Sequence, residues 1–346
     1  MKFVYFVTAV TCMAVVLGSC KKESLSNSIV NSTTSAFNED DALLQTNPVR
    51  YGADIVGPRT IAKNSQNDVN FQTTVADQLG VTCLRETVLV PNYTSNTVPM
   101  LNSGYKILLH FNSPGQGNKT VPFRTDTVQY KKDLLAILKT FTVKPVVAMI
   151  ENEESNRFYY SGSAKDYIMQ LQAGITVMHN HGIKVANGGI TNQGLNLLVY
   201  NDLLKQDKTD SAEQFKNLTH TQPDSASTQN RAAFIDTLLK NYRNMNIDFV
   251  NFHWKDSFPS TQALNQAINY LRKRTQKKVF STEIGALIAN PTTVTTHVQL
   301  CTDQHFPYII WYSPDTSLHL RGTPLQNPDA TLTASGYAYQ SFIAAH

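Results

Sequence analysis

From Val49 to the C-terminus, short apolar segments alternate with helical patterns eight times, and this alternation permits few folds. Some of the apolar segments, such as Val146–Ile150, have no polar residue, which is typical of strands buried on both faces. Strand–helix units in strict order predict a parallel sheet covered by helices. The predicted strands are Val49–Ile55, Val81–Val88, Tyr105–Phe111, Pro145–Glu151, Ile183–Gly188, Asp248–His253, Lys278–Glu283 and Pro307–Tyr312.

Eight such units predict a closed (β/α)8 TIM barrel, formed as a single α/β domain by residues 49–346. Between the strands lie apolar stripes at helical spacing; one of them runs from Ile168 to Met178 and stops at Gly182, where we expect a helix C-cap. The long segment Gln193–Gln229 after strand five is the main insertion, and we expect one or two short helices there, beside the barrel mouth. An open doubly wound sheet is the alternative, but no Gly-x-Gly-x-x-Gly follows the first strand.

The first residues are predicted to be an export signal and not part of the fold. Lys2 begins a short positive region, and Phe3–Leu17 is apolar but too short to span a membrane as a stable helix. The sequence Leu17-Gly18-Ser19-Cys20 resembles the bacterial lipoprotein signal. This resemblance implies removal of residues 1–19 and lipidation of the Cys20 thiol. A conventional secretory peptide with an incidental cysteine is the alternative.

Residues 20–48 are rich in Ser, Asn and Thr, so we expect a flexible tether between the lipid and the barrel. The protein would then be held in the cell envelope by its membrane anchor, in the periplasm or facing the surface. Cys83 and Cys301 fall in a predicted strand and helix, and we expect them to be buried and not joined by a disulfide.

The remaining composition predicts no metal, cofactor or nucleic-acid partner. Neither Cys83 nor Cys301 has a further cysteine or a histidine at metal-ligand spacing. A formal charge of +4 over 346 residues is too small for a nucleic-acid footprint. We expect a monomer.

Polar side chains follow most of the predicted strands, at the ends where active sites of such barrels lie. A barrel built only for stability has no need of so many acids, histidines and aromatic residues at these ends. They are Arg85 near the end of strand two, His110 at the end of strand three, Asn152 and Glu153 after strand four, His253 at the end of strand six, Glu283 at the end of strand seven, and Trp311 and Tyr312 at the end of strand eight.

The pair Asn152-Glu153 together with Glu283 resembles the hallmark of clan A of the glycoside hydrolases, a group of (β/α)8 enzymes that includes the family 5 cellulases and mannanases. A family 39-like member is also compatible with these residues. Further matches are Gly80–Arg85 on strand two, Gly104–His110 on strand three, the strand-six histidine His253 and the strand-eight tryptophan Trp311. The resemblance implies a retaining hydrolase of β-linked oligo- or polysaccharides, with Glu153 as acid/base and Glu283 as nucleophile.

Retention requires two carboxyl groups ~5 Å apart, one protonated and one ionised. The resemblance therefore implies that Glu283 raises the pKa of Glu153, and that Arg85 keeps Glu283 ionised. It also implies that Asn152 binds the sugar 2-hydroxyl, that His110 and His253 orient the sugar and the carboxylates, and that Trp311 offers a flat face to the sugar.

One departure from the clan pattern concerns strand six. Clan members often have His-x-Tyr there, with the tyrosine hydrogen-bonded to the nucleophile, whereas this chain has His253-Trp254-Lys255. Either another tyrosine such as Tyr312 takes that role, or the pKa of the nucleophile is set differently.

Two alternatives stay open from the sequence. Glu151 and Glu154 flank Glu153, so a small register error would exchange the acid for a neighbour. The competing function is a carbohydrate-binding barrel lipoprotein without turnover. A metal-dependent hydrolase is disfavoured because no clear set of ligands is recognisable.

Overall fold

The computed structural model describes residues 48–63, 65–91, 97–113, 120–256, 260–287, 290–318 and 322–346. The expected signal peptide, Cys20 and all of the expected tether except residue 48 lie outside the described residues. Among the helices that are described, none is long and apolar enough to cross a membrane.

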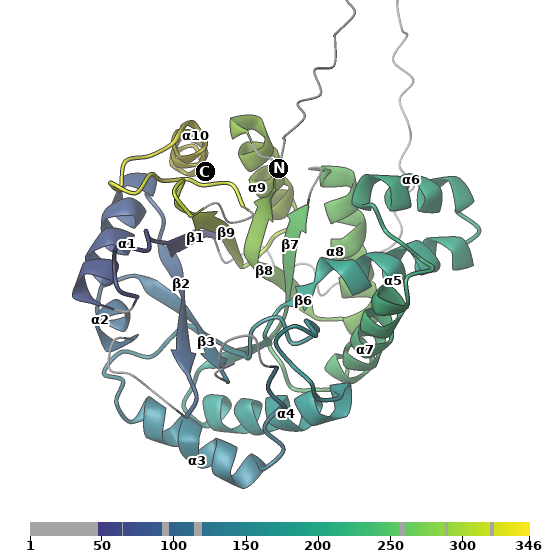
Figure 1. The fold of residues 1–346 in the computed structure, drawn as a ribbon, viewed down its shortest axis with the longest axis horizontal. Coiled ribbons are helices and arrows are strands. Elements are labelled where there is room, and N and C mark those ends of the chain that lie inside the picture. Colours follow the sequence, from purple (N-terminus) through teal and green to yellow (C-terminus); the bar gives the residue numbers. More distant parts are fainter. Residues whose placement is uncertain are drawn as a thin grey trace, which may run out of the picture. The chain divides into compact units, whose positions relative to one another are not determined.

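The described strands are parallel and form one closed barrel (Figure 1). Their order is β5-β4-β3-β2-β1-β9-β8-β7-β6, and a pairing of β5 with β7 closes the ring. Because β5 and the two-residue β6 both pair with β7, they share one of eight positions, which confirms the (β/α)8 prediction. The strands are β1 Arg50–Val56, β2 Cys83–Leu89, β3 Lys106–Asn112, β4 Val147–Ile150, β5 Lys184–Asn187, β6 Ile190–Thr191, β7 Phe249–Asp256, β8 Lys278–Ala286 and β9 Tyr308–Pro314.

Helices surround this ring and follow each of its eight positions (Figure 1). Two of them, α5 and α6, precede α7 and form the insertion expected after the fifth strand. The helices are α1 Gln66–Leu79, α2 Thr97–Leu101, α3 Thr127–Leu138, α4 Ala164–Asn180, α5 Asn192–Lys205, α6 Thr209–Thr219, α7 Ala226–Tyr242, α8 Thr261–Thr275, α9 Pro291–Asp303 and α10 Ala334–Ala344.

Local sequence signals explain where several helices begin and end. In α4, Ser163 and Asp166 form a reciprocal capping box that satisfies backbone donors of the first turn. The chain leaves this helix through Gly182, whose φ of 71° is in the left-handed region that glycine adopts without strain. The predicted stop at Gly182 is therefore confirmed.

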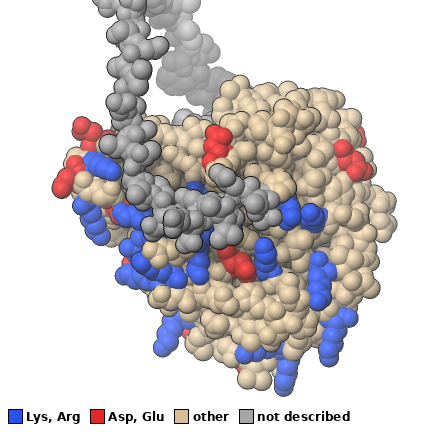
Figure 2. All heavy atoms as spheres, turned by 180° about the vertical axis from the view of Figure 1, so that it is seen from behind, with Lys and Arg blue, Asp and Glu red and all other residues tan. Residues whose placement is uncertain are grey.

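The core fills both the barrel interior and the space between strands and helices. All four residues of β4 are buried, as the wholly apolar sequence predicts. Cys83 and Cys301 are buried free thiols, which confirms the expectation that they form no disulfide. On the face drawn in Figure 2, Lys and Arg side chains are separated by acidic and uncharged surface.

Candidate active site

The turn after β4 separates one outward-facing glutamate from two buried ones. Glu151 and Glu153 have φ values of 66° and 52°, a backbone conformation that is uncommon outside glycine and is often retained at functional sites. Glu151 and Glu154 are fully buried, whereas the Glu153 side chain keeps 15% of its surface exposed. Of these three glutamates, Glu153 is thus the one that a ligand can reach.

Neutral donors hold the two buried glutamates. Glu151 accepts hydrogen bonds from the Ser113 backbone N (2.7 Å) and Oγ (2.5 Å), from Tyr160 Oη (2.9 Å) and from Gln170. Burial raises its pKa. These contacts tie β4 to neighbouring elements and leave Glu151 no access to the mouth.

Glu154 has a similar setting on the other side of the turn. Asn187 Nδ2 (2.8 Å) and Tyr242 Oη (3.0 Å) both donate to Glu154 Oε1. Burial raises the pKa of Glu154 to about 7. Its carboxyl group therefore serves as a packed hydrogen-bonding group of the scaffold.

Glu153 and Glu283 face one another across His253. Glu283 lies on β8 and pairs in register with His253 on β7, just after an irregularity in that pairing. His253 Nδ1 lies 3.1 Å from Glu153 Oε1 and 3.5 Å from Glu283 Oε1. One oxygen of each carboxylate and a nitrogen of His253 all lie within 4.8 Å of one another. The two acids predicted from distant parts of the chain therefore meet at the mouth.

Two glycines make room for this arrangement. A Cβ atom on Gly189 would lie 2.3 Å from His253 Nε2, and one on Gly188 would lie 2.6 Å from the Glu151 carbonyl oxygen. Gly189 also has a φ of 122°, which side-chain-bearing residues rarely adopt. Any other residue between β5 and β6 would displace the histidine or the β4 turn.

Arg85 connects the strand-two end to both carboxylate-bearing strands. Its guanidinium pairs with Glu283 Oε1 at 2.9 Å and donates to Asn152 Oδ1 at 2.8 Å. It also pairs with Asp54 on β1, a buried acid that the sequence reasoning missed. The only signal for Asp54 was a single charge inside the apolar run Ala53-Asp54-Ile55.

Lys255 occupies the position of the missing strand-six tyrosine and ion-pairs with Glu283 Oε2. Its Nζ lies 3.8 Å from the centre of the Tyr312 ring, a cation–π contact. Tyr312 therefore supports the lysine, and the lysine contacts the nucleophile candidate. Of the two alternatives for the absent tyrosine, the structure supports the second: the pKa of Glu283 is set differently, by a lysine cation in place of a tyrosine hydroxyl.

Nearby positive charges lower the pKa values of both Glu283 and Glu153. Burial acts to raise the pKa of Glu283, but His253, Lys255 and Arg85 outweigh it and hold that pKa far below 4.5. Burial also acts to raise the pKa of Glu153, yet the His253 hydrogen bond and charge, assisted by Lys255, lower it overall. The expected raised pKa of Glu153 is therefore wrong for the free protein, because the repulsion from Glu283 is smaller than these attractions.

Trp311 and His110 do not have the places expected of them. Trp311 is fully buried, donates its indole N–H to the Thr323 carbonyl at 3.1 Å and packs against Tyr339 of α10. Neighbouring strand residues point to opposite faces, so Tyr312 reaches the mouth and Trp311 points toward the helices. The prediction of a Trp311 sugar platform is wrong.

His110 is also fully buried. Its Nδ1 lies 2.8 Å from the Glu151 carbonyl oxygen, and its Nε2 lies 3.4 Å from Thr282 Oγ1. Thr282 Oγ1 is in turn 3.1 Å from His253 Nε2. The prediction that His110 orients a sugar directly is wrong; it supports His253 from below through Thr282.

A cleft of about 780 Å³ opens beside these side chains and extends toward the insertion. A smaller hollow of about 180 Å³ adjoins it, because the two share Glu153, Asn156, Asn192, Gln193 and Lys255. The rest of the large cleft is lined by Tyr159, Asn196, Thr219, His220, Thr221, Gln222, Thr228, Leu287 and Tyr312. Apart from Glu153 and Lys255, this lining is mostly neutral amides and hydroxyls, which suit a hydroxyl-rich ligand.

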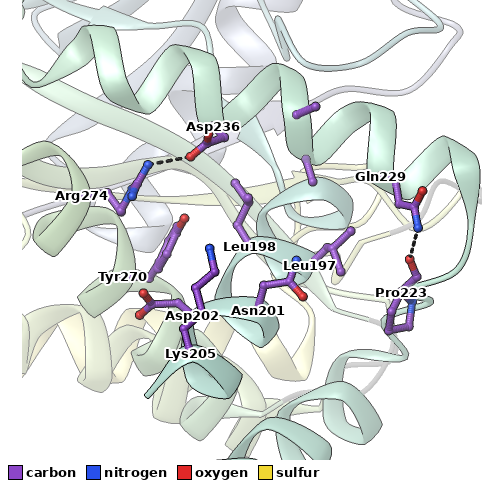
Figure 3. A pocket seen from close by; sticks show the side chains of 12 residues that line it. Leu197, Leu198, Asn201, Asp202, Lys205, Pro223, Gln229, Asp236, Tyr270 and Arg274 are labelled. Atoms are coloured by element: carbon purple, nitrogen blue, oxygen red, sulfur yellow. Dashed lines mark hydrogen bonds and ion pairs between the residues drawn. The ribbon is translucent and has the colours of Figure 1, made fainter. Parts of the chain in front are cut away.

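Another hollow, of about 460 Å³, lies on the helix layer between α5, α7 and α8 (Figure 3). Two of its charged side chains, Arg274 and Asp236, form an ion pair at 2.6 Å. Tyr270 in its wall is buried, and none of the lining residues belongs to a strand. This hollow lacks the convergent polar groups of the barrel mouth.

The ligand atoms of Glu153, His253 and Glu283 are close enough together to coordinate a metal ion. However, Arg85 and Lys255 already neutralise Glu283, and their positive charges oppose the entry of a divalent cation. We therefore assign the cluster to acid–base chemistry.

No protein-family model matches the chain, and no curated protein sequence matches it. Solved structures do match. An endo-β-1,3-glucanase of family GH128 (subgroup II) from Sorangium cellulosum aligns over 84% of this chain and 98% of its own, with 12% identity and a TM-score of 0.51. A GH128 (subgroup VII) oligosaccharide-binding protein from Trichoderma gamsii aligns over 87% and 96%, with 14% identity and a TM-score of 0.50.

A family 39 glycoside hydrolase from the gut symbiont Bacteroides cellulosilyticus WH2 aligns over 86% of this chain but only 63% of its own length. Its identity is 15% and its TM-score 0.53. At these identities the matches establish a shared barrel fold.

Proposed function

We propose that this protein is a retaining glycoside hydrolase with Glu283 as nucleophile and Glu153 as acid/base. The observation that carries the proposal is the pair of facing carboxylates at the ends of β4 and β8, with oxygens within 4.8 Å. Retaining enzymes hold their carboxyl groups about 5 Å apart, whereas inverting enzymes need about 6.5–9.5 Å to admit a water molecule.

In the first step, a Glu283 oxygen forms a bond to the anomeric carbon while the glycosidic C–O bond breaks. Glu153 gives its proton to the departing oxygen. Arg85 and Lys255 keep Glu283 ionised and ready to attack, because each places a positive charge beside its carboxylate. We propose that Asn152, which accepts a hydrogen bond from Arg85, binds the sugar 2-hydroxyl.

In the second step, water attacks the glycosyl ester and gives its proton to the Glu153 carboxylate. The bond to Glu283 breaks, and the carboxylate that reappears is again stabilised by Arg85 and Lys255. The lowered pKa of Glu153 keeps its carboxyl group ionised in the free protein, as the base step requires. The protonated form that the first step needs is therefore populated mainly under acidic conditions. An acidic working range follows.

We propose a β-linked, hydroxyl-rich glycan as substrate. The amides and hydroxyls of the cleft support this class. Because two of the matched proteins are an endo-β-1,3-glucanase and an oligosaccharide-binding protein, β-1,3-glucan and its oligosaccharides are the first substrates to test. β-1,3-Glucan, β-1,4-glucan, β-mannan and xylan would be incubated with the protein and the soluble products measured. A 2-fluoro glycosyl inactivator would then be used to identify the nucleophile, and labelling of a carboxylate other than Glu283 would refute the assignment.

A second candidate is an oligosaccharide-binding protein without turnover. The low pKa of Glu153 favours it, and one matched structure is described as an oligosaccharide-binding protein. The glycan panel separates the two candidates, because binding to an insoluble glycan without released products indicates a binder.

We also propose that the mature chain begins at a lipidated Cys20, on the Leu17–Cys20 sequence alone. Mass spectrometry of the mature N-terminus tests this. A Cys20→Ser variant should leave the membrane fraction, and a membrane-bound variant would contradict the anchor.

A further inference from the structure

Arg231 of α7 is a cation without an ionic partner at the edge of the proposed active site. It lines the smaller hollow together with Glu153, His253 and Lys255. Within the described part of the chain, no carboxylate lies within ion-pair distance of Arg231, and its buried Nε has no hydrogen-bond partner. The guanidinium instead rests 5.6 Å from the centre of the exposed Phe158 ring.

The other charged groups in this hollow have contacts of their own. Glu153 lies 3.1 Å from His253, and Lys255 ion-pairs with Glu283. Glu153 also attracts the Arg231 guanidinium, whereas Arg157 repels it and donates to the Gly162 carbonyl, which does not line the hollow, at 2.6 Å. Arg231 therefore shares the charge of Glu153 with His253 and has no ion pair of its own among the described residues.

A half-buried guanidinium without an ion pair of its own is stabilised when a ligand supplies an anion. Arginine binds carboxylates and sulfates through paired hydrogen bonds, and such charge-assisted bonds are stronger than neutral ones. The remaining lining, Asn156, Thr191, Asn192 and Gln193, is neutral and polar. The hollow thus combines one anion-binding group with groups that suit sugar hydroxyls.

Asn196 gives a second, independent sign of a ligand in the adjoining cleft. It is 4% exposed, lines the large cleft, and its buried Oδ1 accepts no hydrogen bond. A buried amide oxygen without a donor is unfavourable, and the hydroxyl of a bound sugar would supply the missing hydrogen bond. Because the cleft and the hollow share five residues, one oligosaccharide can reach both Asn196 and Arg231.

We propose that Arg231 makes this a site for an anionic glycan, in which the sugar unit beside Glu153 carries a carboxylate or a sulfate ester. The inference rests on the proposed function only for the choice of a saccharide as ligand. It adds a selectivity for charge that the facing carboxylates do not by themselves provide.

The test compares three forms of laminaritetraose whose reducing-end unit carries a primary alcohol, a carboxylate or a sulfate ester at C6. Dissociation constants would be measured by calorimetry on the full-length protein with Glu283→Gln, so that no form is consumed. At least one anionic form should bind about 10- to 100-fold more tightly than the neutral form, the range expected of a charge-assisted hydrogen bond. The gain should shrink as salt is added. The better of the two anionic forms identifies the group.

Arg231→Gln should remove this preference while changing the affinity for the neutral form less than about twofold. Arg243→Gln is the matched control, because Arg243 is the exposed C-cap of the same helix and its loss changes the net charge equally. Equal affinity for all three forms would overturn the inference. An Arg231→Gln loss that is the same for neutral and anionic forms would also overturn it, since Arg231 would then act only through Glu153.

Measuring the products that the protein with Glu283 intact releases from the same three forms distinguishes failure of the hydrolase proposal from failure of the anionic-site proposal. Cleavage of the neutral form without any charge preference retains the hydrolase and overturns the anionic site. Arg231-dependent preference without cleavage of any form supports the anionic site, and the hydrolase is overturned if the other glycans of the panel are not cleaved either.

Discussion

The ends of β4 and β8 hold carboxylates by opposite means. After β4, Glu151 and Glu154 are buried among serine, tyrosine, glutamine and asparagine donors, and burial raises their pKa values. On β8, Glu283 is just as buried, but Arg85, His253 and Lys255 contact it and its pKa falls. The two places differ in the charges around the carboxylate and not in depth of burial, and this difference supports Glu283 as the proposed reacting acid.

The strongest test of the comparison is Glu283→Gln. Removing a covalent nucleophile should lower kcat/KM by more than about 10⁴-fold, while the neutral isostere keeps the volume of the side chain. Product release from the preferred glycan measures this, with circular dichroism as the control for folding. Activity within tenfold of the native protein would show that Glu283 is not the nucleophile.

Glu153→Ala should cost about 10²–10⁴-fold on a glycan, the usual contribution of a general acid–base. Substrates with an activated aryl leaving group need no proton, so their first step should be largely spared, and added azide should restore turnover. Kinetics on an aryl glycoside with and without azide provide the measurement. Glu154→Gln is the matched control in the same turn and should leave both rates near the native values.

Lys255→Met removes a positive charge that lowers the pKa of both Glu283 and Glu153. The acid limb of kcat/KM reports ionisation of Glu283 and the alkaline limb reports protonation of Glu153, so both limbs should move to higher pH. Full pH profiles of Lys255→Met and Lys255→Arg test this, because arginine keeps the charge. Unmoved limbs in the methionine variant would mean that Lys255 does not set these pKa values.

The barrel could be predicted from the sequence because parallel strands that are buried on both faces consist of apolar runs such as Val147–Ile150. The sequence also predicted Glu153, Glu283, Arg85 and His253, which the structure brings into contact. These residues stand at strand ends, where chain position alone fixes the side of the barrel.

What the sequence could not decide was the direction of single side chains. Trp311 and Tyr312 are neighbours, so their side chains point to opposite faces of the strand. An uncertainty of one residue in the predicted strand therefore decides which of the two faces the mouth and which faces the helix layer. Lys255 was missed because its role depends on reaching Glu283, a contact set by the irregular pairing of β7 with β8. The lowered pKa of Glu153 depends on the sum of several charges in three dimensions.

Glu154→Gln tests the scaffold side of the comparison. Burial raises the pKa of Glu154 from 4.5 to about 7, so its stabilising neutral form is fully present below 4.5 and is lost as pH rises through 7. Above pH 7 the glutamine variant should be more stable than the native protein by up to about 3 kcal/mol, and near pH 4 the two should agree. Urea unfolding at both pH values measures this, and a variant that is less stable at pH 8 would contradict it.

Trp311→Phe should have the smallest effect. It removes the hydrogen bond to the Thr323 carbonyl and some packing, which should cost about 1–2 kcal/mol of the free energy of unfolding. KM should stay the same, since Trp311 does not reach the mouth. A several-fold rise in KM with unchanged stability would instead indicate that Trp311 contacts the substrate.

The α5–α6 excursion lies outside the strand ladder yet supplies much of one bank of the cleft, from Asn192 to Thr219. Its exchange for another segment would alter which glycan chains can lie along that bank without disturbing the pairing that closes the ring. For the proposed hydrolase, the α5–α6 segment would therefore influence substrate range, whereas Glu283 on β8 and Glu153 after β4 would carry out the reaction. The segment could then be exchanged by engineering without changing these two residues.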